Sequence, residues 1–388
     1  MEHWPVLLSG GLMLFMFFVI GFVSQKLKLP SVLAYILIGI FLSGFITDKE
    51  TLHSIAEIGI VLLFFLLGLD FPLHKMMGIA KKVWPAGLMD VVLNLGVAFL
   101  IALLFGLDLI TALFIGAVVF ATSSSITAKM LEETKRLANP EAEFILALLI
   151  LEDLIAPILV SFLVGVYSGT EVNIEFISML LFKIILLGVG AIIIGYYGFR
   201  KLGEFVEQYL ERDFMPIFAV AIAFGYAGLA LYFGLSEVLG AFLAGVMLTE
   251  TGKAKDLEHL ILPARDLTLP FFFFWFGTSI SFGEGVPMVA LLLVLVVWSL
   301  AGKLIVGYFG GRQYGLSPRV ALRAGFSLGA RGEFSAIIAA VAPPPWKIFS
   351  GIYILATAFL GVYWFNKAPS WSKFLYQKYF KRDPLPKP

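Results

Sequence analysis

Two acidic residues lie side by side within a long apolar segment of the chain. The segment runs over residues 144–167, and Glu152 and Asp153 fall near its middle. It is long enough to cross a bilayer, because about 20 residues suffice. An ionised carboxylate at that depth costs at least ~2.5 kcal/mol, so such residues usually bind cations or relay protons. The pair therefore predicts an intramembrane site for a cation, a proton or both.

Two other apolar segments are interrupted by polar residues or glycines. One contains the consecutive hydroxyls of Thr122, Ser123, Ser124 and Ser125. The other, residues 324–333, contains three glycines before its final glutamate. Hydroxyl side chains compete with helical backbone bonds, and glycine weakens a helix. We therefore predict two broken helices in the two halves of an inverted repeat, a pattern that points to a transporter's midplane site. The alternative is that these residues only permit tight helix packing.

The expected site combines the acidic pair with the hydroxyl run. Adjacent helical residues point about 100° apart, so we expect Asp153, and not Glu152, to face the crossing of the broken helices. Thr122, Ser123 and Ser124 would supply hydroxyl oxygens to a monovalent cation, together with freed carbonyls. Glu152 is either a second ligand or a residue that attracts cations in a cytoplasmic funnel or acts as a structural partner.

Charged residues elsewhere in the apolar segments are candidates for charge compensation. Lys303 or Arg331 would neutralise Asp153 when no cation is bound, and Arg331 and Glu333 would offset the charges of the helix ends. Asp90 would pair with Lys183 or another base, or face water. Glu57 and Asp70 lie near segment ends and are expected at the surface.

Composition narrows the class of protein further. Hydrophobic residues make up 60% of the chain and charged residues 14%, whereas soluble domains carry roughly 25% charged residues. The net charge of +1 argues against nucleic acid as a partner. There is no cysteine, and the histidines lie in loops or at segment ends, so neither a thiolate metal site nor a zinc or haem site is expected. The chain has no Gly-rich nucleotide loop, so no cofactor is predicted beyond the transported ions.

The fold class predicted is an all-α membrane protein with about thirteen transmembrane helices. Placing the N-terminus outside and the C-terminus in the cytoplasm leaves only Lys49 and Lys347 in outer loops, which follows the positive-inside rule. We expect dimerisation-domain helices over 1–82 and 201–282, and core helices over 83–167 and 283–366. A linker helix is expected over 168–200 and a short cytoplasmic tail over 367–388.

Several motifs in order along the chain resemble a known family. They begin at Lys28-Leu-Pro30 and include the stretch from Glu57 to Asp70, the three serines, and the stretch from Leu239 to Glu250. Pro270-Phe-Phe-Phe-Phe-Trp-Phe-Gly277 and Arg331-Gly-Glu-Phe334 follow. Together they resemble monovalent cation:proton antiporter family 2, the Kef-type exchangers. The stretch from Ala128 to Asp153 is most similar to Kht-type potassium/proton antiporters.

The resemblance implies a function, partners and a location. It implies a homodimer in the plasma membrane that exchanges a monovalent cation for protons by alternating access, with Asp153 binding either ion. Potassium is expected, with sodium, rubidium or ammonium also open, and a separate cytosolic regulatory subunit is implied. Lys303 resembles sodium-exchanging relatives, so an electrogenic sodium/proton antiporter is the first alternative. A gated cation channel is the second, and an intramembrane aspartyl protease is the least favoured.

Overall fold

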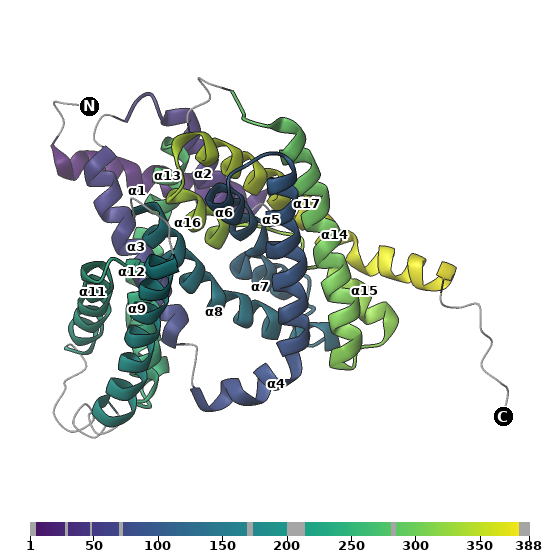
Figure 1. Ribbon diagram of the computed structural model, residues 1–388. Coiled ribbons are helices and arrows are strands. Elements are labelled where there is room, and N and C mark those ends of the chain that lie inside the picture. Colours follow the sequence, from purple (N-terminus) through teal and green to yellow (C-terminus); the bar gives the residue numbers. More distant parts are fainter. Residues whose placement is uncertain are drawn as a thin grey trace. The chain divides into compact units, whose positions relative to one another are not determined.

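The protein is all-helical in the computed structural model, which describes residues 5–27, 30–46, 49–69, 73–168, 174–199, 214–280 and 285–379. Every regular element in these ranges is a helix (Figure 1). The chain divides into two compact units. The first unit comprises Met1–Met77 and Ile155–Ser281, and the second comprises Gly78–Leu154 and Phe282–Pro388. Each unit is therefore assembled from two separate stretches of sequence.

The first unit is built around helix crossings at which glycines meet. Gly39 and Gly68 each lie so close to a partner helix that a Cβ atom would come within 2.2 Å and 2.1 Å of a backbone oxygen. Their partners are Gly277 and Gly245. The elements that lie wholly in this unit are α1 (Val6–Lys26), α2 (Ser31–Leu42), α3 (Lys49–Leu69), α9 (Ile174–Ile193), η2 (Ile194–Phe199), α11 (Met215–Tyr232), α12 (Glu237–Thr249) and α13 (Ala254–Thr278).

The second unit contains both interrupted segments. Its elements, including two helices that the unit boundaries cut, are α4 (Leu73–Asp90), η1 (Val91–Gly96), α5 (Val97–Leu104), α6 (Leu109–Phe120), α7 (Ser124–Glu133), α8 (Pro140–Ser168), α14 (Val289–Tyr314), α15 (Pro318–Phe326), α16 (Glu333–Ala340) and α17 (Pro344–Tyr379). Asp108 caps the start of α6 by accepting hydrogen bonds from the backbone N–H groups of Ile110 and Thr111.

Both predicted helix breaks are present. The first separates α6 from α7 at residues 121–123, and the second separates α15 from α16 at residues 327–332. The two breaks touch each other, because the backbone N–H of Ser123 donates a 2.9 Å hydrogen bond to the carbonyl of Ala330. The sequence prediction of two broken helices that cross is therefore confirmed.

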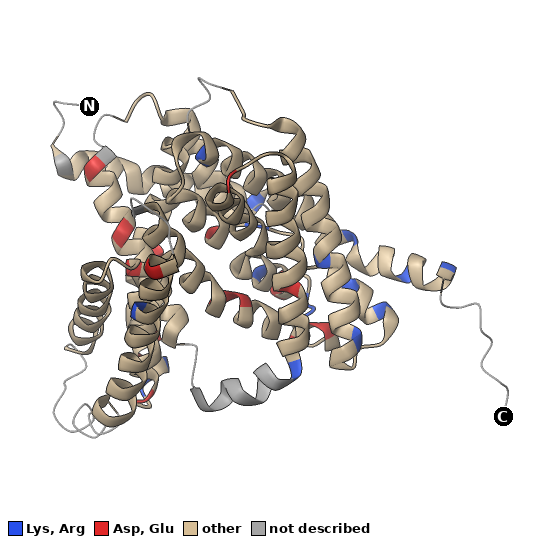
Figure 2. Cartoon of the chain, viewed as in Figure 1, with Lys and Arg blue, Asp and Glu red and all other residues tan. Residues whose placement is uncertain are grey.

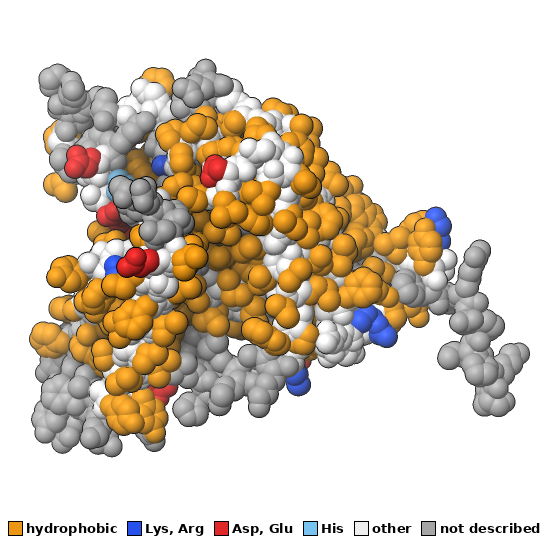
Figure 3. Space-filling view, in the orientation of Figure 1, with side chains coloured by type: hydrophobic (Ala, Val, Ile, Leu, Met, Phe, Trp, Pro, Cys, Tyr) orange, Lys and Arg blue, Asp and Glu red, His pale blue; other side chains and the backbone are white. Residues whose placement is uncertain are grey.

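The predicted spans coincide with helices, with two differences in length. Ten helices in the described ranges are long and apolar enough to cross a membrane, whereas α2 and α12 are shorter, so the number of crossings stays a prediction. One apolar segment, residues 267–280, lies at the end of the longer α13, and the predicted tail over 367–388 continues as helix to Tyr379. Apolar side chains cover much of the visible surface (Figure 3). This surface suits a lipid environment.

Candidate functional site

The second unit buries a group of charged side chains among mainly apolar residues. Figure 2 shows where acidic and basic residues lie along the helices. Every member of the group is at most 6% exposed. The acids are Asp90, Glu152, Asp153 and Glu333, and the bases are Lys303 and Arg331. Buried charges are costly unless they are paired or bound to an ion, so this group is the strongest candidate for the functional site.

Lys303 on α14 binds two carboxylates at once. Its Nζ lies 2.8 Å from Asp90 and 3.0 Å from Glu152. The lysine side chain and Asp90 have no exposed side-chain surface, and Glu152 has only 2%. Of the partners considered for Asp90, a base of the second unit is therefore correct, while Lys183 instead donates to the carbonyl of Phe233.

Both carboxylate oxygens of Glu152 accept hydrogen bonds from the protein. Its second carboxylate oxygen accepts a 2.8 Å hydrogen bond from the backbone N–H of Thr122, which lies in the first helix break. Glu152 is only 1% exposed, and its role as a second ligand, as a residue that attracts cations or as a structural partner stays a prediction. Glu152 thus links α8 to the broken helix and to Lys303.

The serine hydroxyls at the break are directed towards Glu333. Ser123 Oγ donates to Glu333 at 2.5 Å and Ser124 Oγ at 3.3 Å, and the backbone N–H of Ser125 donates at 2.9 Å. Ser123 also caps α7 by accepting from the N–H of Ile126. A helix start leaves backbone N–H groups without acceptors and carries partial positive charge, which explains why a buried glutamate lies there.

Arg331 donates hydrogen bonds to carbonyl groups at or just after the C-terminal ends of α6 and α15. Its Nε donates a 2.8 Å hydrogen bond to the carbonyl of Val119 at the end of α6, and Nη1 donates to the carbonyls of Leu328 and Gly329 after α15. Ser335 adds bonds to the carbonyls of Val118 and Ala121. A guanidinium among carbonyls at helix ends offsets their partial negative charge.

Asp153 and Thr122 are the remaining elements of the expected cation cage. Asp153 is 6% exposed and follows Glu152 on α8. The Thr122 side chain is buried, and its hydroxyl has no hydrogen-bond partner among the residues that the structure describes. A carboxylate and a hydroxyl are both oxygen ligands suited to a monovalent cation. The Thr122 hydroxyl is thus not engaged by a described residue, whereas Ser123 and Ser124 donate to Glu333.

Two features of the second unit were not predicted: the contact of Asp90 with Asn94, and a second buried ion pair. Asp90 ends α4 where a π-helical turn begins, and Asn94 within that turn donates a 2.7 Å hydrogen bond to it. The other feature is Glu141, which is fully buried and pairs with Arg136 at 3.1 Å and with Arg323. The spacing of Asp90 and Asn94, four residues apart on one helix face, was a usable signal for the first. In the second, Arg136 is five residues from Glu141 in sequence, but Arg323 is 182 residues away.

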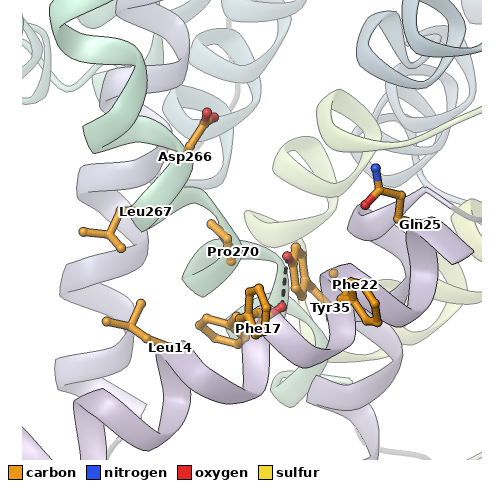
Figure 4. Close-up of a pocket in the computed structure, with 10 residues that line it drawn as sticks. Leu14, Phe17, Phe22, Gln25, Tyr35, Asp266, Leu267 and Pro270 are labelled. Atoms are coloured by element: carbon orange, nitrogen blue, oxygen red, sulfur yellow. Dashed lines mark hydrogen bonds between the residues drawn. The ribbon is translucent and has the colours of Figure 1, made fainter. Parts of the chain in front are cut away.

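A pocket of about 350 Å³ lies in the first unit and contains none of the predicted site residues (Figure 4). Its lining is mainly aromatic and aliphatic, with Phe17, Phe22 and Leu267 among the residues. Its one carboxylate, Asp266, is paired with Arg265 at 2.6 Å. Glu57 is about half exposed, as expected, whereas Asp70 and Lys28 lie outside the described residues.

The fold and the buried charges define a class of membrane transporter, and comparison with known proteins agrees. The family model "Sodium/hydrogen exchanger, transmembrane" matches residues 13–379. The chain belongs to this family of cation/proton antiporters and is a multi-pass membrane protein.

Individual relatives resemble the chain over most of its length. It is 52% identical to the ammonium/H⁺ antiporter subunit AmhT of Alkalihalophilus pseudofirmus, over 96% of each chain. It is 31% identical to the K⁺/H⁺ antiporter subunit KhtU of Bacillus subtilis, over 83% of this chain and 81% of that one. The sodium proton antiporter MjNhaP1 of Methanocaldococcus jannaschii has the same fold, with a TM-score of 0.66, 18% identity and coverage of 95% and 97%.

Proposed function

We propose that this antiporter exchanges ammonium for protons across the cell membrane, with potassium as a second transported cation. The observation that carries the proposal is the 52% identity to an antiporter subunit named for ammonium, over nearly the whole of both chains. Potassium, which the sequence analysis favoured, is supported by the relative that is 31% identical. Ammonium donates hydrogen bonds, so a site of carboxylate, hydroxyl and carbonyl oxygens suits it as well as potassium.

Exchange follows from competition at Asp153. A bound cation or a bound proton compensates the buried carboxylate, and either form leaves the site near neutral. A bare carboxylate buried in an apolar setting carries a large cost, so the empty form should not cross between the two access states. The penalty on that form couples cation movement to proton movement. Thr122 and backbone carbonyls at the break would complete the oxygen cage.

The assembly and topology follow as parts of the same proposal. We infer a homodimer. We also infer that the N-terminus lies outside and the C-terminus in the cytoplasm, from the distribution of Lys and Arg. A separate regulatory subunit is supported by the fact that both relatives are named as subunits. Nucleic acid has no part in the function.

The test is proton flux in proteoliposomes loaded with a pH-sensitive dye. Ammonium, potassium, sodium or lithium is added outside, and the rate of pH change is compared with that of vesicles containing Asp153→Asn. This comparison is needed because ammonia crosses the lipid by itself. Ammonium and potassium should drive flux well above the variant. Flux driven by sodium or lithium alone would contradict the proposed ions, and current without proton movement would favour a channel.

A further inference from the structure

Lys303 pairs with two acids, Asp90 and Glu152. The exchange mechanism proposed above gives no role to Asp90. Lys303 has no exposed side-chain surface, and its ammonium group lies within 3.0 Å of both Asp90 and Glu152. A buried ammonium group stays charged only where anions compensate for its lost hydration. Two carboxylates therefore compensate the charge of this one buried ammonium group.

The oxygens of both acids are already engaged by the protein. Asp90 Oδ1 accepts from Asn94 at 2.7 Å, and Oδ2 accepts from Lys303. Glu152 Oε1 accepts from Lys303, and Oε2 accepts from the backbone N–H of Thr122. Because all four oxygens have donors, this cluster is built to hold a lysine and not to receive a passing cation.

The surrounding helices fix Asp90 in this position. Asn94 lies in the π-helical turn that follows Asp90, and π turns are frequent at functional sites. Trp298 on α14 donates a 2.8 Å hydrogen bond to the carbonyl of Leu93 in the same turn. Gly302, next to Lys303, packs against Asn94 so closely that a Cβ atom would lie 2.7 Å from its amide oxygen. The turn and α14 therefore hold acid and lysine together.

We propose that Asp90 is a positioning residue that keeps Lys303 permanently charged, so that Lys303 takes no part in proton transport and Asp153 exchanges one proton for one cation. Exchange of one monovalent ion for one proton moves no net charge. The balance point between the two gradients is then independent of membrane voltage. This inference rests on the proposed antiport, but it does not depend on which cation is transported.

The experiment measures this balance point in proteoliposomes, with whichever cation the wild-type protein exchanges. Known cation and proton gradients are imposed, the voltage is varied, and the gradient at which net flux vanishes is determined. The wild-type balance point should not move with voltage. In Asp90→Asn, Lys303 retains one anionic partner and should release its proton when a cation binds. Two protons would then move per cation, and about 60 mV would shift the balancing cation ratio tenfold.

Two further variants show whether an effect of Asp90→Asn comes from the lost charge or from a loss of folding. Asp90→Glu keeps the charge and should keep a voltage-independent balance point. The triple variant Asp90→Asn with Glu152→Gln and Lys303→Gln removes all three buried charges together and should also be voltage-independent, because neither a lysine nor an unpaired acid remains in this cluster to exchange a proton. Asp108→Asn, at the exposed start of α6, is the matched control for loss of an acid and should behave as wild type.

The outcomes separate this inference from the proposed function. A voltage-dependent wild-type protein, or an active Asp90→Asn variant whose balance point ignores voltage, would overturn the role of Asp90. If Asp90→Asn is inactive, the triple variant decides: a voltage-independent exchanger supports the inference, and an inactive or voltage-dependent protein refutes it. A wild-type protein that exchanges only sodium would refute the proposed ions. The role of Asp90 would then be tested by the same measurement of the balance point, with sodium as the cation.

Discussion

Asp153 and Glu152 are neighbours in sequence, but we expect opposite consequences when each loses its charge. Asp153→Asn should reduce cation-driven proton flux to background, because the proposed exchanging carboxylate is gone. Glu152→Gln should keep exchange with altered cation affinity, because Glu152 is not the proposed exchanging carboxylate, although its single amide oxygen can replace only one of the two acceptors for Thr122 N–H and Lys303. Flux in proteoliposomes, with thermal unfolding in detergent as the check on folding, measures both. Full exchange by Asp153→Asn would refute the assignment of the site.

The hydroxyls at the first break make a second pair of contrasting variants. Thr122→Val removes a buried hydroxyl that has no hydrogen-bond partner in the described part of the chain, so it should raise the apparent cation constant with little loss of stability. Ser123→Ala removes both a helix cap and a bond to Glu333 and should cost about 0.5–2 kcal/mol of stability. Thermal unfolding and concentration-dependent flux distinguish them. The opposite pattern would return Ser123 to the cation site.

At the level of single residues, the sequence indicated the charged residues of the candidate site. It did not indicate which residues they contact. A carboxylate in the middle of an apolar helix is recognisable by its cost alone, which is why Asp153 and Glu152 were found. The partner of the serine run was not, because Ser123 and Glu333 are 210 residues apart. Sequence spacing carries no information about such a contact.

Close helix crossings in the first unit should tolerate no added atoms. A Cβ at Gly68 would lie 2.1 Å from the carbonyl oxygen of Phe242, so Gly68→Ala must push α3 and α12 apart. We expect a loss of about 1–3 kcal/mol, measured as a lower midpoint of thermal unfolding. Gly228→Ala on α11 is the control, since nothing lies within 4 Å of its added Cβ. That change should be neutral or stabilising.

The buried acid at the start of α8 should be important for stability. Glu141→Gln would leave Arg136 and Arg323 close together without a charge partner, and breaking a buried ion pair costs about 3–5 kcal/mol. Thermal unfolding in detergent should show a clear decrease. Glu143→Gln changes an exposed acid that accepts from Tyr314, and it should have little effect. Equal midpoints for the two variants would contradict this account.

The broken helices were predictable because their cause is local. Consecutive hydroxyls near Ser123 and glycines near Gly329 weaken the helix in which they occur, whatever lies around them. The π-helical turn after Asp90 was not predictable in this way. It depends on Asn94, Gly302 and Trp298 meeting across two helices, and apolar residues surround it in the sequence.

For the whole molecule, alternating access predicts that the break can be reached in turn from each side of the membrane. The chain has no cysteine, so Ser125→Cys provides a single label on an exposed residue at the start of α7. A membrane-impermeant thiol reagent should label it from either face, and the transported cation should change the rate. Ser54→Cys on α3 should be labelled from one face only. Labelling of Ser125→Cys from one face only would contradict alternating access.

The class of molecule was evident from composition, whereas its organisation was only partly so. A charged content of 14% and a long series of apolar segments are sufficient to indicate a polytopic membrane protein. Assigning roles to the two units depends on contacts between distant stretches of chain. The predicted dimerisation and core roles therefore remain predictions.

The backbone hydrogen bond between Ser123 and Ala330 has an evolutionary consequence. A bond from main chain to main chain survives most side-chain substitutions at both positions. Mutations around it can therefore change which ion is held while the crossing persists. Lineages would diverge in cation preference by small steps, without passing through unfolded intermediates. Relatives named for ammonium and for potassium, both alike in sequence to this chain, are the outcome expected of such a history.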